Sequence, residues 1–141
     1  MGQADMLKKV PIFSELAGRD LERLARIMVL RSVKAGEAVI EEGDQAAGVF
    51  IITSGRMEVV RGGGQREQVL ATLGPGDFFG EMALFEGFPR NATVRALEDS
   101  ECLAMTRWDF LAELKNHPEI AVAMLPVLVR RLRAVEAQLT D

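Results

Sequence analysis

The chain has very few of the side chains that form disulfides and soft-metal sites. Among its 141 residues there is one cysteine, Cys102, and one histidine, His117. A single cysteine forms no disulfide within the chain, which argues against a secreted, disulfide-stapled scaffold. A zinc site would have to be built mostly from carboxylates, because its usual nitrogen and sulfur ligands are missing. We therefore expect no bound metal and no metal catalysis.

Long hydrophobic runs and targeting signals are also missing. The longest nearly continuous apolar run, IAVAMLPVLV at residues 120–129, contains Pro126 and is about half as long as a membrane span. The N-terminus has no apolar signal core, and its start, MGQADMLKKV, is expected to be a natural one. We predict a soluble, intracellular, cytoplasmic protein without a membrane span.

Neither a dominant sign of charge nor a catalytic motif is present. The formal net charge is −4, and the three arginines at 130, 131 and 133 make only a small phosphate footprint, so no direct nucleic-acid binding is expected. Nucleophile elbows, Walker loops and dinucleotide fingerprints are absent. We therefore predict that the chain is not an enzyme. Its length suits one domain, residues 1–141, with one core.

The periodicity of the first part of the chain predicts an N-terminal helical segment, residues 1–28. Apolar residues recur at helical spacing at Leu21, Leu24 and Met28, and acidic residues stand in the first turn. Gly18 is the expected N-cap, and the helix is expected to end near residue 28.

Residues 29–105 consist of short β-branched runs separated by glycine turns, which predicts seven or eight strands in a barrel or sandwich. The glycines at 62–64 are expected to form a hairpin tip. The runs occupy residues 29–33, 37–40, 48–53, 56–60, 68–73, 91–96 and 101–105.

The remainder, residues 106–141, returns to a helical pattern. A first helix, RWDFLAELKNH, is stopped by Pro118, and a second covers residues 118–140. Pro126 is expected to kink or break this second helix. Its heptad spacing fits either packing on the chain's own barrel or a homodimer through helix 118–140, and favours the homodimer. The heptad residues are Leu125, Leu128, Leu132, Val135 and Leu139.

The most informative stretch is FGEMALFEGFPRNATVRA, residues 79–96. A glycine turn leads into a short helix expected near Gly80, whose free N–H groups suit an anion. The fork of Arg90 matches two phosphate oxygens, and the Glu81 carboxylate suits a sugar hydroxyl. A Pro-Arg pair or a Gly-Glu pair alone is ordinarily a solvated turn or a helix start. Their joint arrangement predicts a ligand with one phosphate and one ribose.

This stretch resembles the phosphate-binding cassette of the cyclic nucleotide-binding domain family, F-G-E-x-A-L followed by P-R-x-A-T-V-x-A. The likeness extends to LKKVPIFSELAGRDLERLA near the N-terminus and to the two closing helices. The resemblance implies a mainly β (α+β) fold: an eight-stranded β-roll with an N-terminal helix, two C-terminal helices and a cassette at residues 79–93.

The resemblance also implies roles for the cassette residues. Arg90 would hold the cyclic phosphate and Glu81 the ribose 2′-hydroxyl, with no catalytic residue and no cofactor beyond the ligand. Cyclic AMP is favoured over cyclic GMP, although Asn91 leaves the choice of base open. The backbone N–H groups implied to complete the cradle are those of Gly80, Met82, Ala83, Asn91 and Ala92.

Contacts to the base are implied for the final helix, where related activators carry two hydroxyl residues after Arg-Arg-Leu. This chain has Val135 and Glu136 at those places. An apolar lid over the base, with Arg131 or Arg133 stacking on it, is the expected substitute.

We predict a regulatory module that binds a cyclic nucleotide and transmits a conformational change through its C-terminal helices to an unknown protein effector. One alternative is the sensory half of a transcription regulator or channel, cut from a longer chain. Another is a dimerisation module that no longer binds ligand. A small cupin-type enzyme is the last, and the single histidine argues against it.

Overall fold

The computed structural model describes residues 2–43, 48–84 and 92–140, with the backbone alone described at 82, 83 and 140. The chain divides into two compact units. The helical unit is formed by both ends of the chain, up to Ile27 and from Phe110 onward, and the β unit by residues 28–109.

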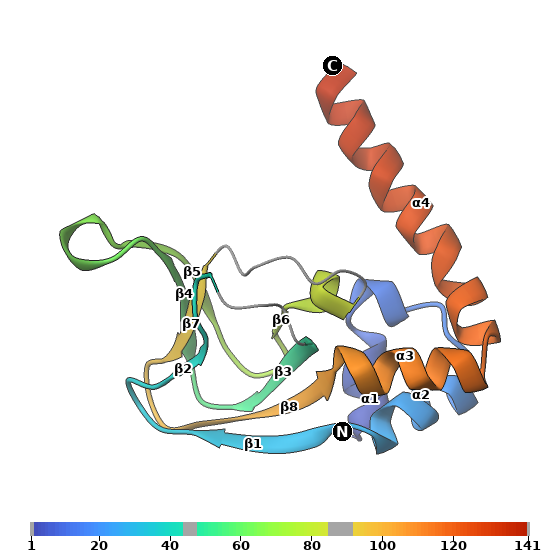
Figure 1. The fold of residues 1–141 in the computed structure, drawn as a ribbon, viewed down its shortest axis with the longest axis horizontal. Helices are drawn as coiled ribbons and strands as arrows, with labels where there is room; N and C mark the ends of the chain where they lie inside the picture. Colours follow the sequence, from blue (N-terminus) through green and yellow to red (C-terminus); the bar gives the residue numbers. More distant parts are fainter. Residues whose placement is uncertain (1, 44–47, 85–91, 141) are drawn as a thin grey trace. The chain divides into compact units, whose positions relative to one another are not determined.

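The β unit is built from two antiparallel four-stranded sheets, ordered β1-β8-β3-β6 and β2-β7-β4-β5 (Figure 1). This arrangement confirms the predicted eight-stranded roll, although the sheets do not close into a barrel. The strands are β1 (Val29–Val33), β2 (Ala38–Ile40), β3 (Gly48–Ser54), β4 (Met57–Arg61), β5 (Gln68–Leu73), β6 (Phe78–Phe79), β7 (Thr93–Ala96) and β8 (Ser100–Thr106).

Each of the seven predicted β-branched runs overlaps a strand, and the bounds of β1 and β5 agree to the residue. The eighth strand, β6, lies outside all of them. It has only two residues, which pair with Phe50 and Ile51 of β3. Two residues are too few to show a period-two pattern, so the sequence does not reveal this strand.

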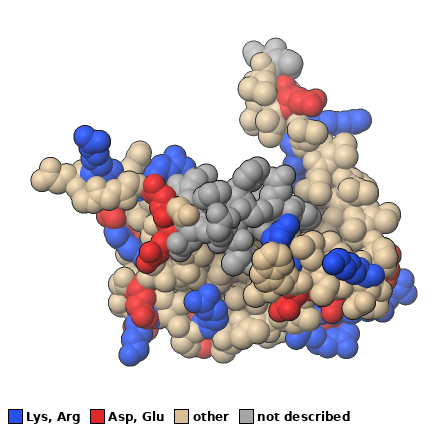
Figure 2. All heavy atoms as spheres, in the orientation of Figure 1, with Lys and Arg blue, Asp and Glu red and all other residues tan. Residues whose placement is uncertain are grey.

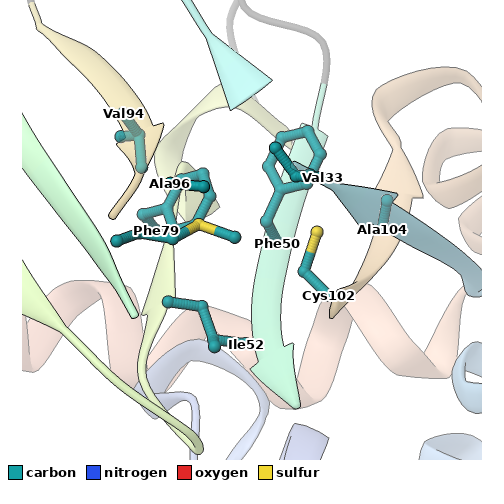
Figure 3. Packing of buried hydrophobic residues seen from close by; sticks show 9 residues of the cluster. Val33, Phe50, Ile52, Phe79, Val94, Ala96, Cys102 and Ala104 are labelled. Carbon is teal, nitrogen blue, oxygen red and sulfur yellow. The ribbon is translucent and has the colours of Figure 1, made fainter. Parts of the chain in front are cut away.

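The core cluster of the β unit in Figure 3 takes alternate side chains of the strands, such as Phe50 and Ile52 of β3, because successive residues point to opposite faces of a sheet. Phe50 of β3 and Phe79 of β6 stack with their ring centroids 5.1 Å apart and their planes 13° apart. The buried residues of this cluster are Val33, Phe50, Ile52, Met57, Phe79, Val94, Ala96, Cys102 and Ala104.

One turn of the β unit requires glycine for two reasons. Gly55, between β3 and β4, has φ +91°, and a Cβ there would collide with the hydroxyl of Ser100. That hydroxyl donates to the carbonyl of Glu98 at 2.8 Å and accepts from the N–H of Arg56 at 3.2 Å. The close approach thus ties the turn to the start of β8.

The helical unit contains α1 (Gln3–Lys8), α2 (Gly18–Arg26), most of α3 (Arg107–Asn116) and α4 (Glu119–Thr140). The predicted N-terminal helix is α2, and α1 with a 3₁₀ turn at Pro11–Phe13 precedes it. The predicted N-cap, Gly18, is wrong: Ala17 is the cap, with extended dihedral angles, and Gly18 is already helical. The helix ends at Arg26, two residues earlier than expected.

The start of α4 is joined to α2 by an ion-pair cluster. Asp20 is buried and pairs with Arg23 at 2.7 Å, and Arg23 also reaches Glu119 at 3.3 Å. His117 Nδ1 lies 3.7 Å from the same Glu119 oxygen. Because a buried carboxylate is costly without a partner, Arg23 is needed beside Asp20 within α2, and its contact with Glu119 is the one that connects α2 to α4.

Helix α4 runs without interruption through Pro126, so a break at this residue is wrong, and the alternative, a kink, stays a prediction. Proline removes one backbone hydrogen bond to the preceding turn, and the helix tolerates this loss. No helix within the described part of the chain is both long enough and apolar enough to cross a membrane.

Candidate functional site

The candidate site begins where β6 ends. Gly80 has φ +84°, a left-handed conformation that favours glycine, and it turns the chain from β6 into the 3₁₀ helix η3 (Glu81–Leu84). The short helix predicted near Gly80 is therefore confirmed. Glu81 is its first residue and is half-buried, and Leu84 is completely buried.

The core holds this turn from the side of β6. Phe79, which is directly before Gly80, pairs in register with Phe50 and stacks on its ring. The guanidinium of Arg31 lies over the Phe50 ring, 5.6 Å from its centroid. Phe79 and Leu84 are both buried, so the short segment between them, which begins with Gly80 and Glu81, is anchored in the core at both ends.

The second described end of the cassette is Ala92, which is 8% exposed and directly precedes β7. Val94 and Ala96 of β7 are both 2% exposed and belong to the core, so the strand fixes the position of Ala92. The hydroxyl of Thr93 accepts a hydrogen bond from the N–H of Glu42 at 2.8 Å.

The remaining predicted cassette residues are described to different extents. Met82 and Ala83 lie in η3, and only their backbone is described. Arg90 and Asn91 lie outside the described residues, so their roles stay predictions. The structure brings Gly80, Glu81, Met82 and Ala83 together in one turn and places Ala92 at the start of β7.

Arg95, on β7, is the centre of a network of charged side chains that the sequence did not predict. The Nη1 and Nη2 atoms of Arg95 donate to the two carboxylate oxygens of Glu67, at 2.7 and 2.8 Å. Its Nε donates to Glu58 of β4 at 2.7 Å. These hydrogen bonds raise the pKa of Arg95, with Glu67 contributing most, and lower the pKa of Glu67. Arg95 and Glu58 are 37 residues apart, and only the strand register pairs them.

The three predicted base-contacting residues are in α4 of the helical unit. Arg131 is half-buried, whereas Val135 is 51% exposed and Glu136 is also exposed. Their proposed contact with a base stays a prediction.

The exposed apolar stripe of α4 contains four of the five predicted heptad residues, Leu125, Leu132, Val135 and Leu139. Leu128 is only half-buried, and Val122 and Val129 belong to the stripe instead. The exposed apolar residues recur at intervals of three or four, with two successive steps of three between Val129 and Val135. They are Val122, Leu125, Val129, Leu132, Val135 and Leu139. This stripe is an exposed surface of the kind that pairs with another helix.

Other chemistry has little support among the described residues. They contain no group of three metal-ligating side chains. Cys102 is fully buried, and burial raises the pKa of its thiol despite the opposing charge of Arg31, so the thiol is expected to be unreactive. Basic and acidic side chains are interspersed on the face shown in Figure 2, unlike the basic stripe typical of a nucleic-acid interface.

Comparison with known proteins gives a family match and close structural neighbours. The family model described as "Cyclic nucleotide-binding domain" matches residues 30–117, more than half of the chain. The chain is similar to the crystal structure of the N-terminal domain of a transcriptional regulator from Streptomyces coelicolor A3(2). The TM-score is 0.88 with 32% identity, covering 96% of this chain and 95% of that one.

Two curated relatives are longer than this chain. The cyclic AMP receptor protein of Thermus thermophilus is 35% identical over 94% of this chain, which spans 62% of its length. The cAMP-dependent protein kinase regulatory subunit of Yarrowia lipolytica is 42% identical over 64% of this chain, which spans 24% of that protein.

Proposed function

The chain belongs to the cyclic nucleotide-binding domain family, and from this we propose that it is a regulatory module that binds cyclic AMP in preference to cyclic GMP. Its curated relatives include a cyclic AMP receptor protein and a kinase regulatory subunit, both regulators by name. We further propose that ligand binding is transmitted through α3 and α4 to a protein effector.

The observation that carries the proposal is the turn at Gly80 and Glu81. The positive φ of Gly80 and the buried neighbours on either side fix the backbone where the family cassette begins. Backbone N–H groups at the start of a helix point along its axis and suit an anionic oxygen. The Glu81 carboxylate at the head of η3 suits a ribose hydroxyl.

We propose that different residues of the cassette bind the phosphate and the ribose of the ligand. Arg90 binds the cyclic phosphate through a charge-assisted, bidentate contact, and Glu81 accepts from the ribose 2′-hydroxyl. Backbone N–H groups complete the phosphate site at Gly80, Met82, Ala83, Asn91 and Ala92. In α4, Arg131, Val135 and Glu136 are proposed to contact the base.

Isothermal titration calorimetry on protein stripped of nucleotide carried over from the expression host tests the proposal. We expect one site per chain and a tighter dissociation constant for cyclic AMP than for cyclic GMP. 5′-AMP, which lacks the cyclic phosphate diester, is the matched control and should bind much more weakly. Absence of heat with both cyclic nucleotides, together with an unshifted melting temperature, would favour the alternative of a dimerisation module that has lost ligand binding.

We also propose a homodimer through α4, with the second copy covering the exposed apolar stripe. Replacing Leu132, which is 59% exposed, by aspartate puts a charge in the middle of that stripe. Light scattering at micromolar concentration should give the mass of a dimer for the wild type and of a monomer for Leu132→Asp. Ala134→Asp, at an exposed α4 position outside the stripe, is the control and should stay dimeric. A monomeric wild type with and without nucleotide would contradict this proposal.

A further inference from the structure

Strand β7 presents two side chains away from the core, and each is tied to another part of the β unit. Thr93 and Arg95 are two residues apart and so lie on the same face of the sheet, opposite to the buried Val94 and Ala96. Figure 1 shows β7 between β2 and β4 in its sheet. Neither residue was singled out by the sequence motif as a ligand contact.

Thr93 is connected to the end of β4 by two hydrogen bonds that share Glu42. The N–H of Glu42 donates to the Thr93 hydroxyl at 2.8 Å, and the carboxylate of the same Glu42 accepts from the N–H of Gly62 at 3.0 Å. Glu42 follows β2, and Gly62 follows β4. One residue thus connects the first residue of β7 with the beginning of the β4–β5 turn.

Arg95 is hydrogen-bonded to Glu67, at the other end of the same turn. Glu67 directly precedes β5 and receives two hydrogen bonds from the Arg95 guanidinium. The turn between Gly62 and Glu67 contains further glycines, with φ +79° at Gly62 and +58° at Gly64. A glycine-rich turn loses much conformational freedom when it is ordered, so both fixed ends contribute to holding it.

We propose that Thr93 and Arg95 are positioning residues of the nucleotide site, which hold the start of β7, and with it the backbone N–H of Ala92, against the β4–β5 turn. This inference rests on the proposed function, since Ala92 is one of the proposed phosphate contacts. Thr93 and Arg95 act through the backbone and do not touch the ligand. When one of these two contacts is lost, the start of β7 is still held by the other contact, by its pairing with β2 and β4 and by the buried Val94 and Ala96, but less firmly.

The matched variants are Thr93→Val and Thr93→Ser. Valine keeps the shape and strand propensity of threonine but removes the acceptor for the Glu42 N–H, whereas serine keeps the hydroxyl. We expect Thr93→Val to weaken cyclic AMP binding about fivefold, the effect of one hydrogen bond of ordinary net strength. Thr93→Ser should stay within about twofold of the wild type. Melting temperatures identify any variant that fails to fold.

Hydrogen exchange measured by mass spectrometry gives a second readout that needs no ligand. In Thr93→Val the peptides covering residues 62–67 and 92–96 should both exchange faster than in the wild type, and in Thr93→Ser neither should. Glu67→Gln, which removes the charged partner of Arg95, should accelerate exchange in the same two peptides. Faster exchange in one peptide alone would overturn the proposed coupling.

The outcomes separate this inference from the proposed function. If the wild type binds cyclic AMP and Thr93→Val binds equally well with unchanged exchange, the positioning role is wrong while the function stands. If the wild type binds neither nucleotide, the function is wrong, and the exchange data alone decide whether the two ties are coupled. Changed exchange with unchanged affinity would also overturn the positioning role, since the ties would then be merely structural.

Discussion

Arg90→Ala should leave the protein folded and weaken its binding of cyclic AMP by about 2–4 kcal/mol, which is roughly a 30-fold to 900-fold rise in the dissociation constant. The proposed reason is that the cyclic phosphate is an anion enclosed by backbone N–H groups, and Arg90 supplies the one full positive charge of the cassette. Removing it leaves the anion without a paired charge in a partly desolvated site. Isothermal titration calorimetry of the wild type and the variant, both freed of bound nucleotide, measures the difference in binding free energy directly.

Two further variants make this result specific. Arg90→Lys keeps the charge but loses the planar fork, so an affinity between those of the wild type and Arg90→Ala is expected. Arg19→Ala removes one positive charge from an exposed position of α2 and should leave the affinity unchanged. Equal affinities of wild type and Arg90→Ala, with both proteins folded, would remove Arg90 from the site.

The local features of the fold were predictable because they depend on residues close together in the sequence. The runs at 29–33 and 68–73 are bounded by turns and rich in apolar and β-branched residues, and they became β1 and β5 without change. Gly80 was placed at a turn before a short helix, and its positive φ agrees with the need for glycine there. The cassette motif likewise is contiguous, so its residues could be named from the sequence.

Features set by pairing between distant residues could not be predicted. Strand β6 exists because β3 supplies its hydrogen-bonding partners, and the contact between Arg95 and Glu58 exists because β4 and β7 are in register at those residues. One residue of the α4 stripe was assigned wrongly for a related reason. Leu128 and Val129 are equally apolar in sequence, and only burial in the folded chain distinguishes the half-buried Leu128 from the exposed Val129.

The core of the β unit and the candidate site are connected through two aromatic rings. Phe50 contributes to the core, and its partner Phe79 directly precedes Gly80. A stacked aromatic pair adds about 0.5–1.5 kcal/mol beyond the burial of its area. The stack therefore stabilises the roll and at the same time orients the residue from which the cassette turn starts.

Phe50→Ala should lower the free energy of unfolding by about 3–5 kcal/mol, as expected for a buried phenylalanine that leaves a cavity. Phe50 is 5% exposed, and the substitution removes its contacts with the Phe79 ring and the Arg31 guanidinium. Since small domains are stable by only about 5–15 kcal/mol, this is a large share of the total. Urea unfolding followed by Trp108 fluorescence or circular dichroism measures the loss.

Ile52→Ala provides a control within the same strand and the same core cluster, because it creates a cavity but keeps the ring stack. Both variants should be destabilised, Ile52→Ala by about 2–5 kcal/mol. Only Phe50→Ala should in addition bind cyclic AMP more weakly when the affinity is expressed per folded molecule, because Phe79 then lacks the ring that orients Gly80 and Glu81. If the two variants bind equally well per folded molecule, the stack stabilises the core alone and has no part in shaping the site.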